Sequence, residues 1–137
     1  MTDSPCRLFV YGTLKPGERA FDRLCQPITL STQPAMASGR LYHLPQGYPA
    51  MTLEPGWVQG VLLTITSLER LQPLDDFEEY YPDRPDRSEY LRHLHPVYDY
   101  SRQPLGTAWV YTMPRDRTLS LGGQWLPEGY WSERQGW

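Results

Sequence analysis

The first apolar segment of the chain, Leu-Phe-Val-Tyr at residues 8–11, stops at Gly12 and is followed by Thr13 and Leu14. Four consecutive apolar or aromatic residues predict a buried strand, and the glycine marks its end. Because glycine has no side chain, the turn after the strand can bring main-chain N–H groups close to a bound anion. The alternative is that Gly12 only reverses the chain, and this segment alone does not decide between the two.

Proline, glycine and aromatic residues are frequent in this chain. Its 137 residues include 14 prolines, 11 glycines, 10 tyrosines and 5 tryptophans. Since proline disrupts helix interiors and both residues favour turns, this composition favours short strands and ordered loops over a helical bundle. The length is typical of one domain, and we expect residues 1–137 to form a single domain.

The apolar pattern places the other regular elements. We expect further strands over four segments: 35–44, 56–65, 89–98 and 107–112. Gly39 is expected to form a bulge or a point of close approach in the first of these. We expect two helices, over 18–24 and 67–77. Pro27 should end the first, Pro73 should break the second, and Thr66 with Glu69 has the spacing of a capping box.

From Pro114 onward the apolar pattern is lost, so residues 114–137 are expected to form an irregular tail over the surface. Trp131 and Trp137 are expected to be exposed on this tail. They cover the domain's own surface or contact a partner, and we favour the first interpretation. The oligomeric state stays open between a monomer and a weak homodimer.

Charge and hydropathy argue against two classes of partner. The formal net charge is −3 and the 13 basic residues are scattered, so the chain lacks the basic stripe that binds nucleic acid. No segment approaches the roughly 18 apolar residues that span a membrane, and the N-terminus lacks the features of a secretory signal. We therefore expect a cytoplasmic protein without nucleic-acid or membrane partners, with Cys6 and Cys25 as free thiols.

Two polar clusters suggest binding sites, and each has a plainer interpretation. His93 and His95 alternate along a strand and share one face, where Asp99 could complete a metal site. Such pairs are common on exposed strand faces, and we expect no metal. Arg84 and Arg87 could clamp a phosphate or a carboxylate. Each follows an aspartate, and we favour solvated surface charge.

An acidic run at residues 75–79 carries the strongest catalytic candidate. Within it, Glu78 follows Phe77 and precedes Tyr80 and Tyr81. Partial burial in such a setting raises the pKa of a carboxyl group and makes it a usable general base. A solvated helix end is the alternative. No Ser-His-Asp or Cys-His pattern competes with Glu78 as the catalytic group.

Seven short motifs in one order carry a resemblance to a known family. They are Tyr-Gly-Thr-Leu at 11–14, Gly-Arg-Leu-Tyr at 39–42, Gly-Tyr-Pro-Ala at 47–50, Gly-Val-Leu at 60–62, Leu-Asp-Asp-Phe-Glu at 74–78, Ser-Glu-Tyr-Leu-Arg at 88–92 and Ala-Trp-Val-Tyr at 108–111. With these motifs the chain resembles the γ-glutamylcyclotransferase-like family, including its γ-glutamylamine cyclotransferase (AIG2-like) branch. The resemblance covers the expected core of the domain, residues 7 to about 113.

The resemblance implies an α+β fold, a small mixed β-barrel flanked by a few short helices. It implies release of 5-oxoproline from a γ-glutamyl amine or small γ-glutamyl peptide, through attack by the substrate's own α-amine. Glu78 would be the acid/base, and no metal or cofactor would be needed. The resemblance also implies a set of residues around the small-molecule substrate: Tyr11, Gly12, Thr13, Leu14, Tyr48, Tyr90 and Tyr111.

Two other functions remain open at this point. A non-catalytic module could bind a small metabolite in the same cavity, and another amide-cleaving enzyme could remove a γ-glutamyl protecting group there. The chain also departs from the family pattern, because many relatives have Gly where it has Glu79. We expect Glu79 to point to solvent, since a carboxylate facing inward would raise the pKa of Glu78 further. The sequence does not identify the leaving amine.

Overall fold

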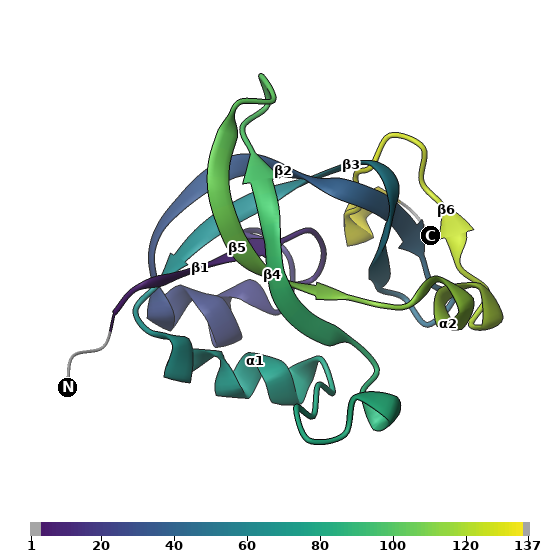
Figure 1. Ribbon diagram of the computed structural model, residues 1–137, viewed down its shortest axis with the longest axis horizontal. Helices are drawn as coiled ribbons and strands as arrows, with labels where there is room; N and C mark the ends of the chain where they lie inside the picture. The colour runs from purple at the N-terminus through teal and green to yellow at the C-terminus, as the bar shows by residue number, and fades with distance from the viewer. Residues whose placement is uncertain (1–3, 136–137) are drawn as a thin grey trace.

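Five strands form a closed ring in the computed structural model, which describes residues 4–135. Around the ring they are β1 (Cys6–Val10), β5 (Pro104–Thr112), β4 (Leu91–Tyr98), β2 (Thr29–His43) and β3 (Pro49–Ile65). β1 pairs antiparallel with β3 and parallel with β5, and the long β2–β3 hairpin closes the ring. The predicted α+β fold is confirmed, and this ring of mixed strands corresponds to the expected small barrel (Figure 1).

The side chains of β1 pack in two directions, which explains its continuous apolar sequence. Leu8 and Val10 belong to a buried cluster that also contains residues of the helical segments. Phe9 and Tyr11 belong to a second cluster, to which all five ring strands contribute. Because side chains alternate along a strand, this second cluster lies inside the ring and the first lies outside it, under the helices.

The helical segments that precede β4 are short and lie on one side of the ring (Figure 1). They are η1 (Phe21–Cys25), η2 (Gln26–Ile28), η3 (Leu68–Leu71), α1 (Gln72–Phe77) and η4 (Pro85–Arg87). η1 is a π-type turn and η2, η3 and η4 are 3₁₀ turns. No helix within residues 4–135 has the length and apolar character needed to cross a membrane.

Two of the three predicted helix signals are confirmed and one is wrong. η1 ends at Cys25, before Pro27 as predicted, and Pro27 itself lies in the first turn of η2, which tolerates its missing N–H. Thr66 forms no capping box, since Ser67 is the residue before η3 and makes no side-chain cap bond. Pro73 lies in the first turn of α1, so the helical region changes from 3₁₀ to α geometry at the predicted break.

The strands are longer than the apolar pattern predicted. β2 begins at Thr29 instead of residue 35, because its first six residues pair with β3 through the backbone while most of their side chains are exposed. β3 begins at Pro49 instead of residue 56, and Gly56 interrupts the apolar pattern within it at a φ of 150°. The predicted bulge at Gly39 is confirmed by a register shift between β2 and β3.

The C-terminal segment is not irregular, and this expectation is corrected. It contains α2 (Arg115–Ser120), β6 (Gln124–Trp125) and the turn η5 (Glu133–Gln135), and β6 pairs with β2 (Figure 1, yellow-green and yellow). Trp131 was expected to be exposed but is fully buried, with its indole N–H donating to Nδ1 of His43 at 2.9 Å. Trp137 lies outside the described residues.

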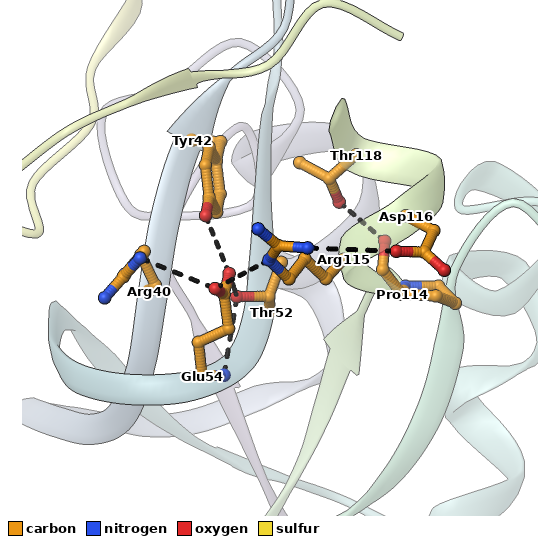
Figure 2. A network of polar contacts seen from close by, with 8 residues as sticks. All are labelled: Arg40, Tyr42, Thr52, Glu54, Pro114, Arg115, Asp116 and Thr118. Carbon is orange, nitrogen blue, oxygen red and sulfur yellow. Dashed lines mark hydrogen bonds and ion pairs between the residues drawn. The ribbon is translucent and has the colours of Figure 1, made fainter. Parts of the chain in front are cut away.

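A carboxylate on β3, Glu54, fixes α2 against the ring (Figure 2). It accepts hydrogen bonds from the Tyr42 hydroxyl at 2.7 Å and the Thr52 hydroxyl at 2.8 Å. Its other partners are Arg40 at 3.4 Å and Arg115, the first residue of α2, at 3.1 Å. We call these five residues the Glu54 network. The network joins β2, β3 and α2 through polar side chains, so no apolar pattern in the sequence marks it.

Candidate active site

A cavity of about 250 Å³ opens where β1 ends. All eight residues that the sequence predicted for the site line it: Tyr11, Gly12, Thr13, Leu14, Tyr48, Glu78, Tyr90 and Tyr111. They come from the turn after β1, the loop before β3, the end of α1, the residue before β4, and β5. The fold therefore brings together residues that are as much as 100 positions apart in the sequence.

The turn after β1 contributes Gly12, Thr13 and Leu14 to the lining of the cavity. Gly12 is required because a Cβ atom there would lie 2.3 Å from Cγ of Pro49. Within the turn, the Lys15 amide donates to the Gly12 carbonyl at 3.0 Å, and the Ala20 amide donates to the Thr13 carbonyl at 3.1 Å. None of the hydrogen bonds between residues 4 and 135 has the amide of Thr13 or Leu14 as its donor. Both residues line the cavity, so the fold leaves two unused backbone donors in its lining.

Glu78 directly follows α1 with a φ of −85° and a ψ of 2°, and its amide donates to the Leu74 carbonyl at 2.9 Å. The residue is half-buried and lines the cavity. Burial, and to a lesser degree the negative charge of Glu89, raise the pKa of this carboxyl group to about 8. A carboxyl group with a pKa near neutrality can both accept and donate a proton, as a general acid/base must.

Glu79 has a left-handed backbone, with a φ of 53°. This conformation disfavours residues with a Cβ by about 1–2 kcal/mol, which explains why glycine suits the position. The expected exposure of Glu79 is confirmed, and its side chain lies at the rim of the cavity. The like charge that acts on Glu78 is therefore Glu89 and not its neighbour in the sequence.

The tyrosines around the cavity donate their hydroxyl protons to the protein. Tyr11 donates to the Tyr111 carbonyl at 2.6 Å, and Tyr90 donates to the Pro49 carbonyl at 2.7 Å. Tyr48 donates to the Glu89 carboxylate at 2.7 Å. Burial raises the pKa of all three hydroxyls, so they stay neutral near pH 7. The tyrosines thus form the walls of the cavity and position their neighbours.

A buried ion pair behind the cavity was not predicted. Both oxygens of Asp75 accept from the Arg92 guanidinium, at 2.8 and 3.0 Å, and Oδ1 also accepts from the Tyr111 hydroxyl at 2.6 Å. These contacts connect α1 to β4 and β5. Asp75, which makes them, lies three residues before Glu78. Helical spacing was the available signal, because residues 71, 74 and 75 share the buried face of this segment.

The other predicted clusters do not come together at this cavity. His93 contacts the Thr112 hydroxyl at 3.0 Å and His95 contacts the Ser38 carbonyl at 2.8 Å. Asp99 accepts two backbone amides in the turn between β4 and β5. Within the described residues, no group of three or more His, Cys, Asp or Glu side chains could hold a metal ion. Arg84 and Arg87 are exposed and do not line the cavity.

Comparison with known proteins relates this chain to cyclotransferases. It is 33% identical over 112 residues to the gamma-L-glutamyl-butirosin B gamma-glutamyl cyclotransferase of Niallia circulans, an alignment that covers 82% of this chain and 69% of that protein. The structure is similar to that of an AIG2-like protein from Mus musculus, with a TM-score of 0.62, 25% identity, and coverage of 80% of this chain and 77% of that one.

A further similar fold is that of YkqA from Bacillus subtilis, with a TM-score of 0.65 and 21% identity. The match covers 93% of this chain and 40% of the YkqA chain, so this chain spans less than half of that longer protein. The sequence model of the family described as "Gamma-glutamyl cyclotransferase, AIG2-like" matches residues 8–133. This match extends through the C-terminal segment and takes in the whole cavity. The chain therefore belongs to the γ-glutamyl cyclotransferase, AIG2-like family.

Proposed function

We propose that this protein is an enzyme that releases 5-oxoproline from a γ-glutamyl amine or a small γ-glutamyl peptide. The observation that carries the proposal is the Glu78 carboxyl, which has a pKa of about 8 and lines the same cavity as the Thr13 and Leu14 amides. Membership of the cyclotransferase family supports the same class of reaction.

The proposed reaction needs a group that moves one proton twice. Near neutral pH the α-amine of a γ-glutamyl compound is mostly an ammonium ion and cannot attack. Ionised Glu78 accepts a proton from it, and the freed amine attacks the γ-carbonyl carbon to form a five-membered ring. Protonated Glu78 then donates its proton to the leaving nitrogen as the original amide C–N bond breaks. All atoms of the products come from the substrate, so no co-reactant is required.

The turn after β1 is the proposed anchor for the substrate. The amides of Thr13 and Leu14 can donate to the α-carboxylate, as successive backbone N–H groups do in anion-binding concavities. The tyrosine rings would hold the chain of the γ-glutamyl group in the folded conformer that ring closure requires, and such orientation supplies several kcal/mol. A cavity of about 250 Å³ is small for a ligand pocket, which suits a γ-glutamyl group whose leaving amine projects outward.

The pH dependence of turnover should report the Glu78 pKa. The base must be ionised in the free enzyme, so kcat/KM is expected to rise with pH and to level off above an apparent pKa near 8. Glu89→Gln removes the neighbouring negative charge and should move this rise to lower pH, because the Glu78 carboxylate then ionises more easily. A pH–rate profile that is flat between about pH 6 and 9 would contradict the assignment.

The same pKa has a consequence for stability. The folded-state pKa of Glu78 lies above its unfolded value of 4.5, so its contribution to stability is fully present below about pH 4.5 and is lost as pH rises through about 8. Ionising this carboxyl therefore costs stability in the pH range where turnover is expected.

The proposal is tested by mass spectrometry of 5-oxoproline released from γ-glutamyl amines, γ-glutamyl amino acids and glutathione. A protein-free incubation controls for spontaneous ring closure. Release from one class of compound would identify the enzyme and its leaving group together. No release from any of them, by protein whose circular dichroism shows it to be folded, would overturn the proposal.

A further inference from the structure

We propose that residues 130–134 act as a positioning strap for the turn that anchors the substrate. The strap crosses residues 15–19, which directly follow the Thr13 and Leu14 amides in the chain. The inference rests on the proposed function, since it assigns the strap to the anchor of that same site. It gives the C-terminal segment a role in substrate binding.

The turn depends on contacts from outside itself. Residues 12–20 contain no helix or strand, and three backbone hydrogen bonds hold the turn together: Lys15 to Gly12, Glu18 to Lys15 and Ala20 to Thr13. Ordering such a segment costs conformational entropy at every residue, so further contacts are needed to keep one conformation.

Two charged side chains of the turn are buried beneath the strap. Lys15 and Glu18 are only 6% and 7% exposed, although such residues are rarely buried without partners. The Lys15 ammonium donates to the Trp131 carbonyl at 2.6 Å. The Glu18 carboxylate accepts from the Ser132 hydroxyl at 2.8 Å and from the Glu133 amide at 3.3 Å. The strap thus supplies partners that make this burial possible.

The strap also fixes Arg19, a residue that lines the cavity. Glu133 accepts from the Arg19 amide at 3.1 Å and from its guanidinium at 3.4 Å. On the same side, the Arg134 guanidinium donates to the Gly17 carbonyl at 2.8 Å. One glutamate therefore holds both the backbone and the charged side chain of a residue at the cavity.

The segment that leads into the strap is hydrogen-bonded to strands of the ring, and this holds the strap in one position. The Leu126 amide donates to the Leu41 carbonyl at 2.8 Å, and the Gln59 amide donates to the Gly129 carbonyl at 2.7 Å. Trp131 is fully buried inside the ring. The substrate turn is consequently tied to β2 and β3 through the C-terminal segment as well as to β1 through the chain itself.

The test compares Glu133→Ala with Glu54→Ala. Both changes remove a carboxylate with several polar partners, but no residue of the Glu54 network lines the cavity. Glu133→Ala is expected to speed hydrogen exchange of the Ala20 amide and to raise KM for a γ-glutamyl substrate, each at least about tenfold, with little change in kcat. Glu133→Gln keeps an acceptor for the Arg19 amide and should restore most of the loss.

Glu54→Ala should lower the melting temperature without changing KM or exchange at the turn. If Glu133→Ala changes only the melting temperature, as Glu54→Ala does, the strap is structural support alone and the inference is wrong. Hydrogen exchange does not require turnover. If the wild-type protein converts no γ-glutamyl compound, the proposed function fails, while exchange at the Ala20 amide still decides whether the strap orders the turn.

Discussion

Replacing Glu78 with Gln is expected to lower kcat by about 10²–10⁴-fold, the range that a positioned general acid/base contributes. The amide keeps the size of the side chain but cannot take the proton from the substrate ammonium group. Binding of 5-oxoproline, measured by NMR titration, should change little, because the proposed anchor is the backbone of Thr13 and Leu14. Above pH 7 the variant should be more stable than the wild type, since the wild type must keep a carboxyl with a pKa of about 8 in a desolvated site.

Glu79→Gln is the matched control for this experiment. It makes the same chemical change at the next residue, whose side chain is exposed at the rim of the cavity. Its turnover is expected to stay within a few-fold of wild type. Full turnover by Glu78→Gln would remove Glu78 from the mechanism. If the wild type converts no substrate and Glu78→Gln loses affinity for 5-oxoproline, the protein is better explained as a metabolite-binding module.

Replacing Asp75 with Asn is expected to cost about 3–5 kcal/mol of unfolding free energy, as breaking a buried ion pair from one side does. The Asp75 and Arg92 side chains are 5% and 13% exposed, so the guanidinium would lose its partner in a largely desolvated place. The Tyr111 hydroxyl would also lose its charged acceptor. Urea unfolding at constant pH measures the effect.

Asp76→Asn provides the comparison for the ion pair. Asp76 is exposed on the same helix and accepts a hydrogen bond from the Gln72 side chain at 3.1 Å. Surface changes of this kind usually alter stability by no more than about 0.5 kcal/mol. Equal effects of the two substitutions would show that the buried pair contributes nothing specific to stability.

The parts of the site that the sequence could predict are those encoded by local pattern. A buried strand that stops at Gly12 is visible in five consecutive residues, and the strand, the turn and Glu78 belong to motifs that occur in a fixed order. The Gly39 bulge and the break at Pro73 also follow from single residues with strong backbone preferences. Such features need no knowledge of distant contacts.

The parts that could not be predicted depend on tertiary contacts. Glu89 acts on Glu78 only because the loop before β4 returns to the end of α1. Trp131 stands among polar and glycine residues in the sequence, and its burial requires the ring interior and His43. The first residues of β2 pair through their backbone while most of their side chains face solvent, so no apolar pattern marks them.

The most direct measurement of the proposed chemistry is turnover of a γ-glutamyl amine in water enriched in ¹⁸O, followed by mass spectrometry of the products. Ring closure by the substrate's own amine predicts 5-oxoproline without ¹⁸O, because no water enters the reaction. Glutamate carrying one ¹⁸O atom would show that water attacks the γ-carbonyl instead, and would contradict the cyclising mechanism assigned to Glu78.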